Sequence, residues 1–277
     1  SKTSKGRAIQ NLINIEQDDK VMAFICTQDL KDEDYINSHY VIMATKQGQV
    51  KKTSLEQYSR PRSNGINAIT IKEDDVLLEA KLTTGESQVM LALKSGKAIR
   101  FEEAKTRPMG RNASGVRGIR LQDEKTDEVI GMIAVDDMES NILVVSENGY
   151  GKRSSLEDYR ITNRGGKGVK TISITEKTGN LVSIKNVTDE DDLMIINKSG
   201  IAIRMAVADL RVMGRATQGV KLINLKGNDS IAAVAKVMKD EEEDIEDIEE
   251  EVIESELSDD QDSNEDGTAI DNNETEN

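Results

Sequence analysis

Residues 142–153 read ILVVSENGYGKR, which is a short apolar run, a turn that closes on glycine, and a basic residue four positions after that glycine. A short apolar run that ends in a glycine turn is typical of the first half of a β-hairpin. The pattern occurs four times, with its glycines 48, 53 and 51 residues apart. The four copies are 41–44 with Gly48 and Lys52, 89–92 with Gly96 and Arg100, 142–145 with Gly149 and Arg153, and 193–196 with Gly200 and Arg204.

A second glycine follows each hairpin pattern, after a loop of small, polar and basic residues. Apolar residues stand one, four and six positions after this loop glycine, and the last two alternate as in a half-buried strand. A third apolar run, such as 129–135 or 231–237, then closes each unit. The loop glycines are Gly65, Gly115, Gly168 and Gly219, and Gly6 with Ile9 and Leu12 repeats the motif without a hairpin before it.

These repeats of about fifty residues predict an all-β, propeller-like fold. Each unit supplies about four short strands, which we interpret as one blade, and no long amphipathic helix appears. We expect the fold to cover residues 1–238 as four full repeats and one partial N-terminal repeat. The chain opens at Ser1 in the middle of a unit, which suggests a segment of a longer protein with an exposed strand edge.

The charge changes sharply near the end of the chain. The net charge of the whole chain is −15, but residues 240–277 contain 20 acidic residues and no Lys or Arg. The first 239 residues therefore carry 37 basic against 32 acidic residues. Dense negative charge without aromatic residues is typical of disorder, so we expect residues 239–277 to be a disordered acidic tail.

Several classes of protein are disfavoured. No apolar run approaches the ~18 residues that a membrane span needs, and no signal peptide opens the chain, so we expect a cytoplasmic protein without a membrane partner. One cysteine, Cys26, and one histidine, His39, exclude an internal disulfide and a Cys/His zinc site. We expect Cys26 to pack within a strand over 21–27.

Catalytic interpretations are weak. Tyr159, between basic residues, resembles a nucleophile beside phosphate-binding cations, but Tyr58 stands at the equivalent place in another repeat, which favours packing. The glycine-rich residues 165–168 lack the spacing and the Lys-Ser/Thr pair of a nucleotide-binding P-loop. With no base, nucleophile or metal-ligand constellation, a hydrolase has the least support, and no cofactor is expected in this chain.

The positive charge recurs with the repeat. Lys52, Arg100, Arg153 and Arg204 share one position of the hairpin. Four residues before the loop glycines stand Lys2, Arg111, Arg164 and Arg215, with Arg62 displaced by one place. In a radial array of blades these cations form a belt suited to a bent polyanion, with a backbone nest at 164–168. The alternative is that these cations are only solvated surface residues without a DNA partner. The two phenylalanines and five tyrosines provide no platform for stacking single strands, which favours duplex binding.

Several stretches of the repeats carry a resemblance to a known family: 43–53, 60–66, 109–111 with 115–121, 148–153, and 214–215 with 217–220. Through them residues 1–238 resemble the family of C-terminal domains of the bacterial DNA gyrase A subunit. The family implies a six-bladed β-pinwheel that wraps duplex DNA, so that ATP-dependent strand passage introduces negative supercoils. The partners that it implies are the gyrase B subunit plus a second A subunit, reached through the absent N-terminal region, and the location is the bacterial cytoplasm at the nucleoid. The catalytic tyrosine and the sites for ATP and Mg lie outside this chain in that family.

The hallmark of the family is the heptad Gln-Arg-Arg-Gly-Gly-Lys-Gly in its first blade. Residues 162–168 keep the last five positions in a later repeat and lack the initial Gln-Arg. The resemblance therefore assigns phosphate contacts to Arg164 and Lys167. Together with the repeated cations, the predicted DNA phosphate-binding residues are Lys52, Arg62, Arg100, Arg111, Arg153, Arg164, Lys167, Arg204 and Arg215.

Two alternative functions are also consistent with the sequence. The equivalent C-terminal domain of topoisomerase IV has a degenerate hallmark heptad and would carry a similar repeat. A propeller-like scaffold would instead bind proteins through the same surface, with complexes that are insensitive to salt.

The acidic tail yields a first prediction. It either keeps the protein soluble or competes with DNA for the basic body as an intramolecular brake. If it is a brake, deleting residues 240–277 tightens duplex binding at low salt, because 20 negative charges no longer compete with phosphates. Equal affinity of the full and shortened chains in a low-salt titration contradicts the brake.

Overall fold

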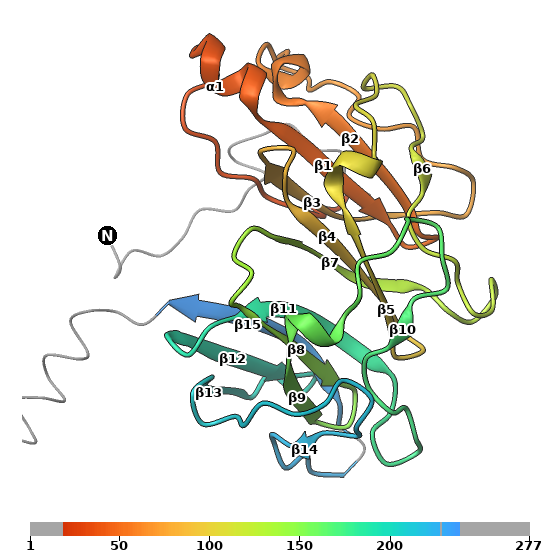
Figure 1. Ribbon diagram of the computed structural model, residues 1–277, viewed down its shortest axis with the longest axis vertical. Coiled ribbons are helices and arrows are strands. Elements are labelled where there is room, and N and C mark those ends of the chain that lie inside the picture. Colours follow the sequence, from red (N-terminus) through yellow and green to blue (C-terminus); the bar gives the residue numbers. More distant parts are fainter. Residues whose placement is uncertain (1–18, 228, 239–277) are drawn as a thin grey trace, which may run out of the picture. The chain divides into compact units, whose positions relative to one another are not determined.

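The computed structural model describes residues 19–227 and 229–238 (Figure 1). Lys2, the partial repeat around Gly6 and the acidic tail lie outside the described residues. A short helix, α1 (Glu33–Ser38), precedes the first hairpin, with Asp32 accepting hydrogen bonds from the N–H groups of Asp34 and Tyr35 at its start. The rest of the described chain is built from strands, turns and short 3-10 helices.

All four predicted hairpins are present. Each turn closes on a glycine with φ between +79° and +86°, a conformation that residues with a side chain rarely adopt. The hairpins are β1 (Tyr40–Thr45) with β2 (Gln49–Ser54), β4 (Gln88–Leu93) with β5 (Lys97–Glu102), β8 (Asn141–Ser146) with β9 (Tyr150–Ser155), and β12 (Asp191–Asn197) with β13 (Ala202–Ala206). Short 3-10 helices follow three of them: η2 (Leu55–Tyr58), η3 (Glu103–Lys105) and η4 (Leu156–Asp158).

The third apolar run of each repeat forms the strand at which neighbouring sheets meet. These strands are β3 (Leu77–Thr83), β7 (Val129–Val135), β11 (Leu181–Val187) and β15 (Ile231–Met238), and each pairs with the first strand of its own hairpin. β3 packs against β7, and β7 against β11. We call this side of each sheet its inner edge and the opposite side its outer edge.

The outer strand of a sheet comes from the following repeat, not from its own as predicted. β6 (Val116–Arg117) pairs with β2, β10 (Val169–Lys170) with β5, and β14 (Val220–Lys221) with β9. The strand order is therefore β3-β1-β2-β6 in the first sheet (Figure 1). In the sheet β13-β12-β15, β13 has no outer neighbour among the described residues.

Backbone hydrogen bonds explain why the chain crosses to the preceding sheet. The carbonyl oxygens of Gly48, Gly96 and Gly149 accept from N–H groups of the next repeat at 2.8–2.9 Å. The loop glycine Gly115 lies so close to β2 of the first hairpin that a Cβ on it would be 2.5 Å from the Val50 carbonyl oxygen. The equivalent distance at Gly219 is also 2.5 Å, to the carbonyl of Gly151. At these two positions only glycine fits, which explains the loop glycine in their repeats.

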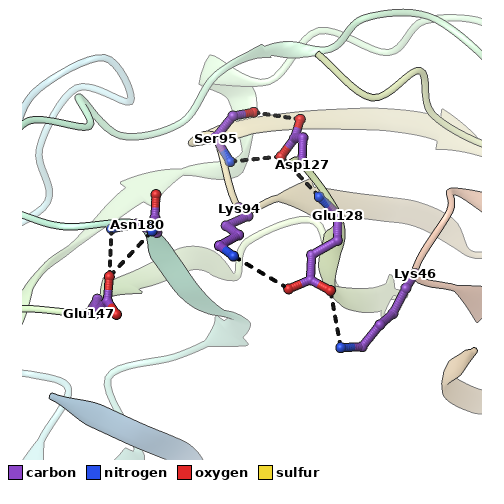
Figure 2. A network of polar contacts seen from close by, with 7 residues as sticks. All are labelled: Lys46, Lys94, Ser95, Asp127, Glu128, Glu147 and Asn180. Carbon is purple, nitrogen blue, oxygen red and sulfur yellow. Dashed lines mark hydrogen bonds and ion pairs between the residues drawn. The ribbon is translucent and has the colours of Figure 1, made fainter. Parts of the chain in front are cut away.

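Polar contacts join neighbouring hairpin turns at the inner edge (Figure 2). The Val129 N–H donates to the Lys46 carbonyl, and the Leu181 N–H donates to that of Lys94, at 2.9 and 3.0 Å. The Glu128 carboxylate lies between the ammonium groups of Lys46 and Lys94, at 3.0 and 3.8 Å. These bonds tie each repeat to the one before it.

The hydrophobic core lies between sheets. Met90 of β4, Ile133 of β7 and Val144 of β8 are buried in one cluster that draws on two repeats. Another cluster joins Ile42 of β1 to Leu91 of β4, and a third joins Leu143 of β8 to Leu193 of β12. Burial therefore couples each repeat to its neighbour, and a single repeat has no complete core.

Three of the four hairpin cations in the predicted belt are buried, whereas a belt needs exposed side chains. Lys52, Arg100 and Arg153 retain 4%, 8% and 7% of their exposed surface. Neighbouring repeats cover this hairpin position, so the side chains enter the junction between repeats instead of solvent. Lys52 Nζ lies 3.5 Å from the Glu103 carboxylate, and the Arg153 guanidinium binds Asp189. In this structure the three side chains are therefore engaged in contacts between repeats, and their predicted phosphate contacts stay predictions.

Arg100 shows how such a cation joins two repeats. Its Nη1 donates to the carbonyl oxygens of Leu156 and Tyr159 at 2.7 and 3.0 Å, which fixes η4 of the next repeat. Its Nε donates to Gln88 Oε1 at 2.5 Å. Burial lowers the pKa of this guanidinium.

The fourth hairpin cation, Arg204, is exposed. Its Nε lies 2.6 Å from Asp192 Oδ2, within the same hairpin. This ion pair occupies part of the guanidinium. Arg204 is more exposed than its three equivalents because no further strand pairs with β13 among the described residues.

The segment 21–27 also differs from its prediction. It forms no strand, and Cys26 is exposed. Ala23 and Ile25 pack against the cluster around Ile36, whereas Phe24 is 75% exposed. The alternation of a strand is present, but no neighbour among the described residues supplies the hydrogen bonds of a ladder.

The buried role of Arg100 gives the second prediction. Arg100→Met leaves the carbonyls of Leu156 and Tyr159 without their donor, and we expect it to lower the free energy of unfolding by roughly 2–3 kcal/mol. Chemical denaturation measures this loss, and Arg107→Met, at an exposed position, serves as the control. Unchanged stability of the Arg100→Met protein would contradict the structural role.

Candidate nucleic-acid interface

The loops that carry the outer strands form a cationic surface, which we call the outer rim: residues 107–117, 160–170 and 211–221. The loops run along the second strand of the preceding hairpin, where the Met109 N–H donates to the Lys52 carbonyl at 2.7 Å. The Thr162 and Met213 N–H groups make the equivalent bonds to Arg100 and Arg153. The same backbone path therefore recurs in three consecutive loops.

Arg164 and Arg215, both predicted phosphate contacts, occupy equivalent half-buried places on this rim. Arg164 donates from Nε to the Lys105 carbonyl and from Nη1 to the Arg117 carbonyl, both at 3.1 Å. Arg215 repeats these bonds to the carbonyls of Asp158 and Lys170, at 2.9 and 2.8 Å. A guanidinium has five donors, so each arginine is held in place and keeps donors for a phosphate.

Arg111 takes the same position in the first loop, and its N–H is held by Gln57 Oε1 at 3.1 Å. Arg62, which is exposed, lines a polar cleft with Arg111 and Asn112. The structure thus brings together two of the predicted cations from adjacent repeats.

The glycine-rich segment 164–168 lies beside an opening of about 210 Å³. Arg160, Asn163 and Lys167 line it, which provides two cations and an amide, all donors suited to phosphate oxygens. Thr162 also lines the opening, but its hydroxyl already donates to the Arg100 carbonyl at 3.2 Å. Lys167 is exposed, as its predicted role requires. The predicted backbone nest loses one donor, because the Gly165 N–H already donates to the Gly118 carbonyl at 2.5 Å.

Sequence reasoning missed two further sets of exposed cations. Arg107, Arg160 and Arg211 stand eight residues before the loop glycines, and Arg117, Lys170 and Lys221 stand two residues after them. In the outer strands the valine after each loop glycine is partly buried, so the next side chain points outward. The fixed offsets were the signal that could have identified both sets.

The tyrosines confirm the packing interpretation. Tyr159 is buried, shares a hydrogen bond with the Thr171 hydroxyl, and has a pKa raised to about 12 by burial. The Tyr58 hydroxyl donates to the Ala68 carbonyl at 3.1 Å. Within the described ranges no group of three or more His, Cys, Asp or Glu side chains is arranged to hold a metal ion. None of the helices described there is long and apolar enough to cross a membrane.

Comparisons with known proteins agree with this geometry. The family model described as DNA gyrase C-terminal domain, beta-propeller, matches residues 39–84, 89–136, 140–188 and 191–238, more than half of the chain. The DNA gyrase A subunit of Staphylococcus aureus strain MRSA252 is 44% identical over 248 residues, which cover 89% of this chain and 27% of the relative. The same protein of strain NCTC 8325 is 44% identical over 244 residues. The chain thus spans about a quarter of the length of these curated relatives.

Two solved structures share the fold. The C-terminal domain of DNA topoisomerase IV has a TM-score of 0.76 at 24% identity and covers 84% of this chain and 71% of its own. The DNA gyrase A C-terminal domain has a TM-score of 0.74 at 24% identity and covers 85% and 76%. With the family model matching all four repeats, the chain belongs to the DNA gyrase C-terminal domain family of β-propellers.

Proposed function

We propose that this chain binds duplex DNA along the outer rim and wraps it, as the C-terminal domain of a gyrase A subunit. The observation that carries the proposal is the threefold recurrence of the rim cations in consecutive repeats. Three loops follow the same backbone path, and each presents cations eight and four residues before and two residues after its loop glycine. A duplex that passes along the rim meets an equivalent set at each repeat.

Recognition of this kind needs no base contacts. Phosphate neutralisation supplies the free energy of binding and also offsets the cost of bending the duplex, as in other proteins that wrap DNA. Among the described residues the one α-helix, α1, has six residues and an acidic first turn, so it is not suited to reading the major groove. We therefore infer binding that tolerates many sequences.

In the whole enzyme this domain would act with the gyrase B subunit plus a second A subunit. Wrapping would present two crossing segments of the duplex, with a defined handedness, to the cleavage core. ATP-dependent strand passage would convert this crossing into negative supercoils. ATP and Mg would bind elsewhere in that enzyme, and this chain would break no bond itself. Such an assembly would work at the bacterial nucleoid, in the cytoplasm.

Two alternatives make different predictions. A topoisomerase IV domain shares the fold, but the 44% identity to gyrase A subunits favours gyrase. A protein-binding scaffold would leave the rim cations without a phosphate partner, and its complexes would be insensitive to salt.

Duplex binding as a function of salt tests the proposal. Replacing Arg107, Arg160 and Arg211 by alanine removes three exposed cations, and we expect the slope of log K against log salt to fall by about 0.9 for each phosphate that is no longer neutralised. The matched control replaces Lys125, Lys177 and Lys226, exposed lysines in turns that lead to the inner strands, and leaves the net charge equal to that of the rim variant. A flat salt dependence of the unaltered chain, or equal losses in both triple variants, would contradict rim binding.

A further inference from the structure

Two buried lysines lie under the outer rim. Lys51 on β2 and Lys152 on β9 occupy the same position of two repeats, one residue before Lys52 and Arg153. Their side chains retain 0% and 1% of their exposed surface. A buried ammonium group is costly unless hydrogen bonds compensate for the lost water, so such a residue requires an explanation.

Both ammonium groups bind the backbone of the loops above them. Lys51 Nζ donates to the carbonyl oxygens of Ala68 and Arg111, and Lys152 Nζ donates to that of Gly214 at 2.5 Å. Gly214 directly precedes Arg215. Each of the two lysines therefore fixes the backbone at or next to a rim arginine.

The same loops are also held from their other side. The Arg111 N–H donates to Gln57 Oε1 at 3.1 Å, and the Arg215 N–H donates to Asp158 Oδ2 at 3.3 Å. The backbone that carries each arginine is thus clamped between a side chain of a 3-10 helix region and a buried ammonium group. This arrangement limits where the guanidinium can lie before DNA binds.

The fold itself does not require this lysine. The equivalent residues in the other two repeats are Ile99 and Ile203. Ile99 is buried under the loop of Arg164, where its Cδ1 lies 3.4 Å from the place of a Cβ on Gly166. An isoleucine at positions 51 or 152 is therefore a substitution that the repeat already contains.

The charge of these lysines is close to titration. Burial lowers the pKa of Lys51 to about 8, aided by the nearby Arg111. Burial also lowers the pKa of Lys152 to about 8, where Arg215 acts in the same direction and Asp158 opposes it. Both groups carry their charge at pH 7 and lose it as the pH rises through 8.

We propose that Lys51 and Lys152 are positioning residues for phosphate recognition, which fix the loops of Arg111 and Arg215 from below and add positive potential to the rim without touching DNA. The inference rests on the proposed function of the rim. It separates the rim into loops that an ammonium group supports and the loop of Arg164, which an isoleucine supports.

A double-mutant cycle on the full chain tests the coupling. Lys152→Ile removes the support, and we expect it to weaken binding of a 30-base-pair duplex about 3- to 10-fold, in the range of coupled neighbours. In an Arg215→Ala background the same substitution costs less than about twofold, because the contact it positions is gone. In an Arg160→Ala background, where the altered loop lies over Ile99, the full loss remains.

A pH series gives a readout that loss of packing alone would not change. Duplex affinity of the unaltered chain falls between pH 7 and 9, and that of the Lys51→Ile, Lys152→Ile double variant stays flatter. The charged groups around the two lysines are Asp158, Arg111 and Arg215, and burial raises the pKa of the neighbouring Tyr58 and Tyr159.

The outcomes separate the two proposals. A steep salt dependence with additive effects of Lys152→Ile and Arg215→Ala overturns the positioning role and leaves DNA binding intact. Absence of salt-dependent binding by the unaltered chain overturns the proposed function itself. If circular dichroism shows that Lys152→Ile does not fold, Lys51→Ile with Arg111→Ala provides the same cycle in the first repeat, and additivity there overturns the inference.

Discussion

The exchange of an outer strand between repeats is the constraint on which the rest of this structure depends. Because β6, β10 and β14 complete the sheet of the repeat before their own, the loop that leads to each must cross a junction. The crossing presses the loop glycine against a neighbouring carbonyl and carries the basic residues of the loop to the outer edge. The same step thus closes a sheet, joins two repeats and creates the rim.

This constraint also explains why cations of the same repeat differ in role. A hairpin cation such as Arg100 lies where the next repeat covers its sheet, so it binds carbonyl oxygens of that repeat. A loop cation such as Arg160 lies on the segment that does the covering and stays exposed. Arg164 and Arg215 lie between these extremes, because they donate to backbone carbonyls and still reach the surface.

The sequence was sufficient to predict the hairpins, the loop glycines and the all-β repeat, since turn glycines and apolar alternation are local signals. It was not sufficient to predict which repeat receives each outer strand, because pairing between repeats leaves no local mark. For this reason periodicity predicted exposed side chains at Lys52, Arg100 and Arg153, where a neighbouring repeat covers the strand. The buried Lys51 and Lys152 escaped notice for the same reason, because a lysine in a strand predicts a solvent-facing side chain.

In the proposed function the rim bends a bound duplex along its path in addition to neutralising its phosphates. The most direct measurement is the linking number of a nicked plasmid that is ligated in the presence of increasing amounts of this chain and then freed of protein. Wrapping predicts topoisomers displaced from the protein-free distribution in one direction, in proportion to the protein bound. An unshifted topoisomer distribution at saturating binding would show that the rim binds DNA without wrapping it, and it would contradict the proposed wrapping.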